Sequence, residues 1–147
     1  MDWVKIGTAG VLAVAFAGAL MVRDQPASIA ATLPLPPICG DAHAGHGDAS
    51  MQEHLDMMAA GKSVELADLI QTMEPMHTDM MRGMGAADFE TAFVCSMIPH
   101  HQGAVEMAQV AQKYATDPWI LMFAQEIIST QQVEIREMQA WLARKAQ

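Results

Sequence analysis

Two long stretches with the periodicity of an α-helix fill the carboxyl-terminal half of this sequence and leave little choice of fold class. The first follows Asp88 and runs to about Tyr114, and the second follows Asp117 and runs to about Lys145. Aspartate accepts hydrogen bonds from the free N–H groups at a helix start, and Pro118 suits the first helical position. Because only a short loop joins these stretches, we expect two antiparallel neighbouring helices.

Two further helices are predicted upstream of this pair. A short one spans residues 50–60, with Ser50 as its N-cap in a capping box. The next spans residues 63–82, where Pro75 either kinks the helix or starts a new one after a break near Thr72. No segment carries the alternation of a strand. The sequence therefore predicts an all-α protein, a small up-and-down helical bundle.

The amino-terminal part has a different character. Residues 6–22 form an unbroken run of apolar or small side chains, of a length between a signal-peptide core and a full membrane span. We expect residues 1–30 to be either an export signal cleaved after Ala30 or an uncleaved membrane anchor. Residues 31–49 read as a flexible linker rich in proline and histidine, and residues 50–147 as the helical bundle. Either alternative places that bundle outside the cytoplasm.

The charge of the chain limits its partners. The formal net charge is −9, and all of it comes from residues 31–147. This acidity argues against nucleic acid and anionic lipid surfaces, and it mildly favours cations. Any contact with a membrane would run through residues 6–22, if they are not removed.

Methionine is unusually frequent, at 14 of 147 residues, whereas aromatic residues make up only 5%. Placed at about 100° per residue, methionine and histidine fall on helical stripes that we expect to face the bundle interior. The stripe on residues 63–82 and just beyond contains Leu66, Leu69, Ile70, Met73, Met76, His77, Met80, Met81 and Met84. The next contains Phe89, Phe93, Ser96, His100, Ala104, Met107, Ala111 and Tyr114, with Met97 and His101 at its edge. The last contains Ile120, Phe123, Ala124, Ile127, Gln131, Glu134, Ile135, Met138 and Leu142.

A methionine at such spacing usually serves adaptable core packing, but repeated thioethers around histidines indicate a metal site. Thioether and imidazole without thiolate select Cu(I), for which Ag(I) is a chemical mimic. We expect Gln131 and Glu134 to accept a hydrogen bond from an imidazole N–H, which fixes the nitrogen left free to bind metal. The segment with His43 and His46 is either a loose metal-capturing arm, suited to Cu(II), or a solvated linker.

The two cysteines, Cys39 and Cys95, are expected to form a disulfide that pins the linker across the outside of the bundle. Exported proteins with two cysteines commonly pair them. Cys95 maps to the side of its helix opposite the methionines and histidines, beside Ile98 and Gln102. It is therefore badly placed to bind the same metal.

The segment MIPHHQGAVEMAQ, with Asp88-Phe89 before it and EIIxxQxxEIxxMxxWL over residues 126–142, resembles the CopM-like copper-binding proteins. The resemblance covers about residues 73–142. It implies a ferritin-like helical bundle, exported to the periplasm, that binds Cu(I) and Ag(I) and is associated with copper resistance. Carried onto matching positions, it implies the ligands Met76, His77, Met80, Met97, His100, His101, Met107 and Met138. A second, weaker candidate site comprises Met51, His54, Met57 and Met58, together with His43 and His46.

The sequence thus predicts an extracytoplasmic protein, not an enzyme, that sequesters copper or shuttles it to a copper-exporting or copper-accepting protein. The alternative is a membrane-anchored accessory or structural subunit in which methionine only packs. A ferritin-like di-iron oxidase is a third reading. It requires paired Glu-x-x-His motifs, and only Glu74 and His77 have that spacing.

Overall fold

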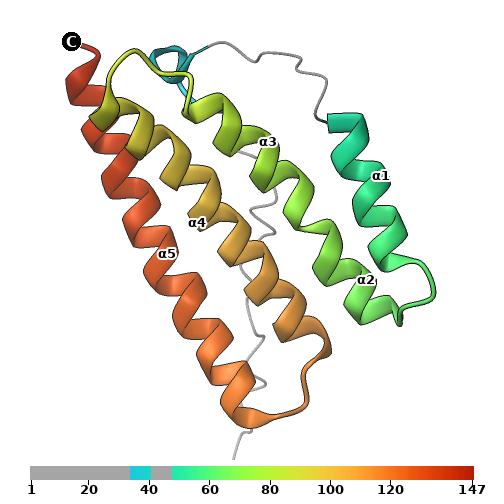
Figure 1. Cartoon of the computed structure of the whole chain (residues 1–147). Coiled ribbons are helices and arrows are strands. Elements are labelled where there is room, and N and C mark those ends of the chain that lie inside the picture. Colours follow the sequence, from blue (N-terminus) through green and yellow to red (C-terminus); the bar gives the residue numbers. More distant parts are fainter. Residues whose placement is uncertain (1–33, 41–47) are drawn as a thin grey trace, which may run out of the picture.

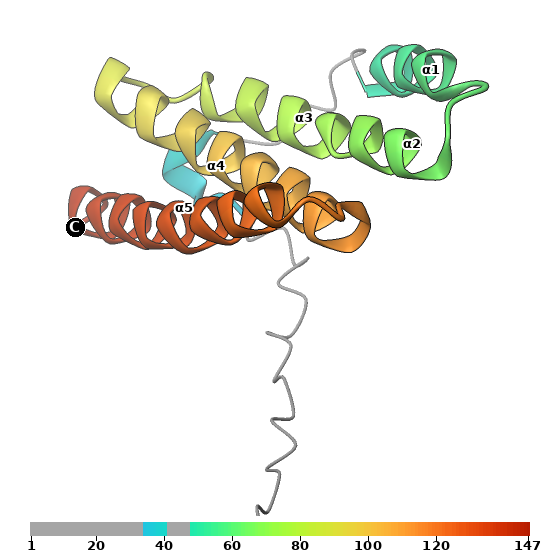
Figure 2. The same cartoon turned by 90° about the horizontal axis from the view of Figure 1, so that it is seen from below.

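The computed structural model describes residues 34–40 and 48–147, and in this part of the chain every regular element is helical. Helix α4 lies between α3 and α5, and α1 flanks α2 and α3 on the side away from α5 (Figures 1 and 2). The prediction of an all-α bundle is confirmed, whereas the expected signal or anchor helix lies outside the described residues. The elements are the 3-10 helix η1 (Pro37–Cys39) and the α-helices α1 (Asp48–Ala59), α2 (Val64–Gln71), α3 (Met73–Gly83), α4 (Phe89–Tyr114) and α5 (Pro118–Lys145).

The two long helices begin where their aspartates predict. The Asp88 side chain accepts a hydrogen bond from the backbone N–H of Thr91 at 3.0 Å. Asp117 accepts hydrogen bonds from the first backbone N–H groups of α5 in the same way. The prediction for α1 is wrong in detail, because the helix begins at Asp48 and Ser50 lies inside its first turn.

The predicted helix over residues 63–82 is two helices. The chain breaks at Thr72, whose hydroxyl donates to the carbonyl of Leu69 at 2.8 Å, and α3 then starts at Met73. Pro75 therefore lies in the first turn of α3. The missing N–H of a proline costs nothing there, because the first turn has no intrahelical acceptors for its donors. Of the two alternatives for Pro75, the new helix is the correct one.

The inward face of α4 differs in part from the predicted one. The large side chains expected inside are exposed, since Phe89 keeps 83% of its accessible surface, Phe93 55% and Met107 42%, whereas Ser96 of the same stripe is buried. The buried residues of α4 are instead smaller ones, among them Cys95, Ile98, Gly103, Val105 and Ala108. Small side chains let helix backbones approach closely, and a Cβ added to Gly83 would lie 2.5 Å from the Cys95 carbonyl. Close packing against α3 thus decides which face of α4 is buried.

The predicted disulfide between Cys39 and Cys95 is confirmed. It holds residues 34–40, which we call the strap, against the side of α4 where Cys95 is buried. Leu35 of the strap is 5% exposed and joins a core cluster with residues of α4 and α5. Arg82 Nε donates to the Gly40 carbonyl at 3.3 Å, and Arg82 Nη2 donates to the Leu35 carbonyl at 3.4 Å. Part of the predicted linker is therefore packed structure.

Disulfides are typical of proteins outside the cytoplasm, where thiols are not kept reduced. None of the helices in the described part of the chain is long and apolar enough to cross a membrane.

Candidate metal centre

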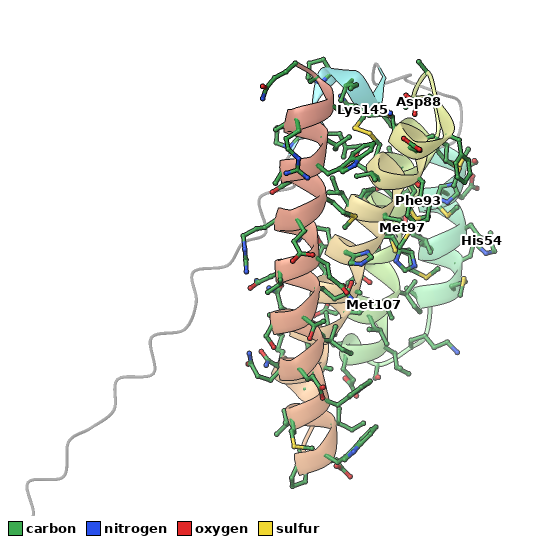
Figure 3. All side chains as sticks on the ribbon, turned by 90° about the vertical axis from the view of Figure 1, so that its left-hand side faces the viewer. His54, Asp88, Phe93, Met97, Met107 and Lys145 are labelled. Carbon is green, nitrogen blue, oxygen red and sulfur yellow. A yellow bond between two sulfur atoms is a disulfide. The ribbon has the colours of Figure 1, made fainter. Side chains whose placement is uncertain are left out.

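The methionines and histidines of α4 line the side of the helix away from the strap. Figure 3 shows Phe93, Met97 and Met107 in succession along α4, with His54 set apart on α1. His100 belongs to the same exposed stripe of α4. We call this side of α4, with the neighbouring sides of α3 and α5, the open face.

The α4–α5 contact brings one histidine to a carboxylate on the open face. Nε2 of His101 lies 3.1 Å from Oε2 of Glu134. One turn toward the start of α4 leads from this pair to Met97, and one turn toward the end of α5 leads to Met138. Because the helices are antiparallel and rise equally per residue, these two methionines lie level with each other. The ion pair of Lys145 with Glu90, at 3.2 Å, fits the same register, because it joins the end of α5 to the start of α4.

Met97, His101 and Met138 form what we call the inner group. The His101 side chain is 13% exposed, whereas Glu134 keeps 45% of its accessible surface. Met97 is half-buried, and Met138 packs against the core cluster that includes Ile135. The inner group therefore sits at the base of the open face, between α4 and α5.

The two ring nitrogens of His101 have different surroundings. Nε2 faces the Glu134 carboxylate at 3.1 Å, so Nδ1 is the ring nitrogen left for a metal. Nδ1 is buried and has no hydrogen-bond partner among the described residues. An unpaired buried polar atom costs about 1–3 kcal/mol. A metal ion bound at Nδ1 would remove that cost, and a carboxylate on the other ring nitrogen is the usual support for a histidine ligand.

The α3 side of the open face carries a second set of donors. A Cβ on Gly103 would lie 2.6 Å from Met76 Sδ, so Met76 of α3 lies beside Gly103 of α4. This contact sets which residues of the two antiparallel helices lie opposite each other. Met80 is then level with His100, and Met73 with Met107. Met73 is 40% exposed, Met84 54% and Met107 42%; both histidines of this set are exposed. We call this set the outer group, and it comprises Met73, His77, Met80, Met84, His100 and Met107.

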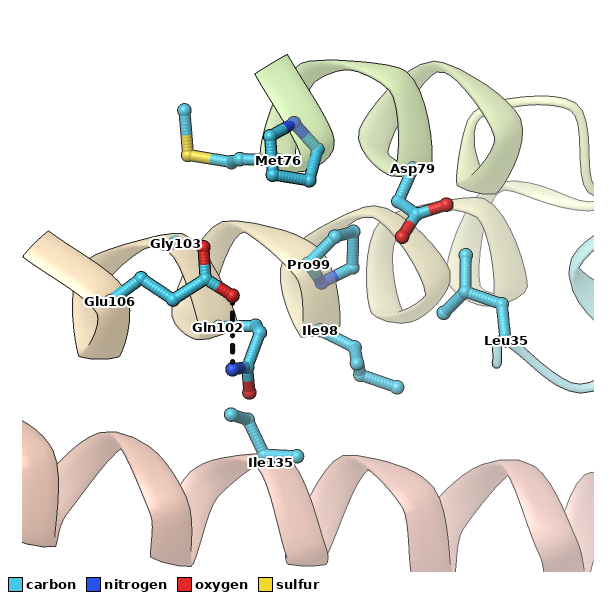
Figure 4. Close-up of a pocket in the computed structure, with 10 residues that line it drawn as sticks. Leu35, Met76, Asp79, Ile98, Pro99, Gln102, Gly103, Glu106 and Ile135 are labelled. Atoms are coloured by element: carbon cyan, nitrogen blue, oxygen red, sulfur yellow. Dashed lines mark hydrogen bonds between the residues drawn. The ribbon is translucent and has the colours of Figure 1, made fainter. Parts of the chain in front are cut away.

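Met76 is separated from both groups. It lies over Gly103 and lines a small cavity of about 20 Å³ on the strap side of α4, which Leu35 closes from one side (Figure 4). Burial raises the pKa of Asp79 in the same cavity, with Arg82 acting in the opposite direction. Met76, one of the eight ligands that the family resemblance implies, thus lies on the strap side of α4 and away from the open face.

The remaining predicted residues are less well placed. Gln131 is half-buried but makes no hydrogen bond within the described part of the chain, so only Glu134 reaches a histidine. On α1, His54 is exposed and Met58 keeps 43% of its accessible surface. Helix α1 packs against α2 and α3, so these residues do not join the inner group. His43 and His46 lie outside the described residues.

Sequence periodicity missed which side of α4 is exposed. The signal that would have found it is the short or absent side chains at Cys95 and Gly103, which lie about 80° apart on one side of the helix. Large apolar side chains drew attention to the other side. Because the disulfide requires Cys95 to face the strap, it points to the same orientation.

Residues 34–40 and 48–147 contain no group of three or more His, Cys, Asp or Glu side chains arranged to hold a metal ion. Methionine sulfur is the abundant remaining donor. No curated protein matches the chain. A family model described as Domain of unknown function (DUF305) matches residues 16–142, which is most of the sequence. The chain therefore belongs to this family of unknown function.

Proposed function

We propose that this protein binds Cu(I), with Ag(I) as its mimic, through methionine sulfur and histidine nitrogen in the periplasm, and thereby sequesters or shuttles copper. The observation that carries the proposal is the buried, unpartnered Nδ1 of His101, oriented by Glu134. The donor set of the inner group is one imidazole and two thioethers. Neutral nitrogen and sulfur donors suit a soft monovalent ion in low coordination.

The choice of Cu(I) over harder ions follows from the donors. Zinc prefers thiolates, several histidines or carboxylates. Both cysteines are in the disulfide, so no thiolate is available to compete. Thioethers do not titrate, so such a site keeps its donors in acidic, oxidising surroundings. Cu(II) capture by His43 and His46 remains a separate prediction.

The two donor groups suggest holding and exchange. The inner group is half-buried between α4 and α5, where a metal would be partly shielded from water. The outer group is exposed, so a partner protein can reach its sulfurs and take the metal by replacing one ligand at a time. We expect a copper-exporting or copper-accepting protein as that partner, and no catalytic step by this chain.

The test is an anaerobic titration of the whole protein with Cu(I) against a chromogenic chelator. We expect His101→Ala to lower the affinity by at least about tenfold, since it removes the oriented ligand. His54→Ala is the matched control, because it removes an exposed histidine from α1, and we expect it to leave the affinity unchanged. Circular dichroism checks that both variants keep their helices.

Two outcomes would count against the proposal. If the unmodified protein does not compete with the chelator, methionine serves packing alone and the accessory-subunit alternative gains support. If His101→Ala and His54→Ala have equal effects, copper binds without the inner group. The packing of Met138 against Ile135 is the observation that keeps the structural alternative open.

A further inference from the structure

The methionines of the two donor groups differ in their access to solvent. In the outer group, Met73, Met84 and Met107 are 40%, 54% and 42% exposed. In the inner group, Met97 is half-buried and Met138 packs against the core. Small oxidants in solvent therefore reach the first set far more readily than the second.

We infer that Met73, Met84 and Met107 are separate, reversibly oxidised positions along the open face, at which a peroxide converts thioethers to sulfoxides and so releases soft metal from the outer group. This regulation rests on the proposed Cu(I) binding. It adds a reason why two donor groups with different burial lie on one face: the outer group loses its metal under oxidative conditions, and the inner group keeps its own.

The reaction is balanced by the peroxide alone. The O–O bond of hydrogen peroxide breaks, and one of its oxygen atoms forms a bond to the methionine sulfur. The sulfur loses two electrons, and the other oxygen leaves as water. A sulfoxide binds metals mainly through its hard oxygen, which is a poor match for Cu(I) or Ag(I). A thiol-dependent methionine sulfoxide reductase supplies the two electrons of the reverse step and releases the added oxygen as water, which restores the soft donor.

Exposure makes this chemistry a switch rather than damage. A sulfoxide is polar, so forming one in a packed core disrupts the core. Met76 Sδ would be 2.6 Å from a Cβ at Gly103, which leaves no room for an added oxygen on that side. At Met73, Met84 and Met107 the added oxygen can enter water, so the helices survive the modification.

Silver is the suitable probe because it does not take part in peroxide chemistry as copper does. The whole protein is treated with hydrogen peroxide with and without Ag(I), and each methionine is scored by peptide mass spectrometry. We expect Met73, Met84 and Met107 to oxidise before Met97 and Met138, and bound Ag(I) to protect them. Met57 and Met122, at 65% and 62% exposed but away from the open face, should oxidise equally with or without silver.

The metal capacity of the oxidised protein is then measured by equilibrium dialysis against Ag(I). We expect the loss of the silver held by the outer group, retention of the silver held by the inner group, and recovery after treatment with methionine sulfoxide reductase. In the variant Met73→Leu/Met84→Leu/Met107→Leu, peroxide should cause no further loss of silver. The matched control Met57→Leu/Met122→Leu should respond to peroxide as the unmodified protein does.

The failures are distinguishable. If the unoxidised protein binds no Ag(I), both the proposed function and this inference are overturned. If it binds Ag(I) but oxidation leaves its capacity unchanged, or silver protects Met57 as well as Met107, only the inference is overturned. Loss of helical circular dichroism on oxidation would show damage instead of a switch, and would also overturn it.

Discussion

His100 and His101 are neighbours in sequence but have different surroundings. The side chain of His100 is exposed on the open face, whereas His101 is 13% exposed and lies 3.1 Å from Glu134. Their rings meet edge to face with centroids 5.9 Å apart. Adjacent residues on a helix point about 100° apart, so one ring turns to α5 and the other to solvent. A paired-histidine motif therefore supplies one oriented donor and one free donor.

The carboxylate of Glu134 has a measurable part in this arrangement. We expect Glu134→Ala to weaken Cu(I) binding by about tenfold, because His101 loses the carboxylate that orients its ring. Glu137→Ala, an exposed carboxylate one turn away on α5, serves as the control. Competition titrations of both variants give the comparison. Equal affinities would mean that Glu134 does not orient the ligand.

Asp79 allows a test of the strap-side cavity through stability. Burial raises its folded pKa above the unfolded value, so at neutral pH its charge opposes folding. The penalty disappears as the pH falls through the folded pKa. Asp79→Asn should therefore raise the unfolding free energy at pH 7, with less difference from the unmodified protein near pH 4.

The effect of Asp88 on stability should depend on pH in the opposite direction. Hydrogen bonds from Thr91 lower its folded pKa, so its stabilising contribution is present above the unfolded pKa and is lost as the pH falls through the folded pKa. Asp88→Ala should destabilise the protein at pH 7, least so in strong acid. Urea unfolding of both variants across this pH range provides the measurement. Destabilisation by Asp79→Asn at pH 7 would contradict the account of the cavity.

At the scale of the helices, local chemistry predicted boundaries better than orientations. The starts of α4 and α5 followed from Asp88 and Asp117, because a cap depends only on residues within one turn. The buried side of α4 did not follow, because it depends on how closely α3 can approach. Gly83 and Gly103 permit that approach, and a rule that places the largest apolar side chains inside cannot detect it.

The two glycines make this argument testable. A Cβ on Gly83 would meet the Cys95 backbone at 2.5 Å, so Gly83→Ala should destabilise by about 1–3 kcal/mol despite the better helix propensity of alanine. At Gly103 the clash is with the flexible Met76 side chain, so Gly103→Ala should cost less, and adding Met76→Ala should relieve the clash. Urea unfolding measures all three variants. A stabilising Gly83→Ala would refute the close approach of α3 and α4.

For the whole molecule, the strap and the open face lie on opposite sides of α4. The disulfide closes a large loop, between residues separated by 56 positions. Its removal should cost about 2–4 kcal/mol, mainly by freeing the unfolded chain. Met138 packs against the core cluster that contains both cysteines, whereas His101 and Met97 lie away from the strap. Cys39→Ser/Cys95→Ser should therefore lower the melting temperature while leaving most of the Cu(I) affinity at temperatures where the variant is folded. A parallel loss of affinity would show that the two sides are coupled.

The candidate site was predictable as a set of residue types but not as a geometry. The sequence contained Met97, His101, Glu134 and Met138 among its candidates. The sequence could not show that Met76 lies apart from these four residues. That distinction depends on how far α5 and α3 are shifted along their axes relative to α4. Those shifts come from packing between residues far apart in the chain, such as Lys145 with Glu90.

The most direct test of the account is X-ray absorption at the copper edge of the Cu(I)-loaded protein. With one equivalent of Cu(I), we predict both sulfur and nitrogen neighbours around copper, and a smaller nitrogen contribution in His101→Ala, in which only His77 and His100 of the outer group can still supply nitrogen. The same spectrum in His54→Ala should match that of the unmodified protein. A copper environment of nitrogen and oxygen only would contradict the central claim that methionine and His101 bind Cu(I) together.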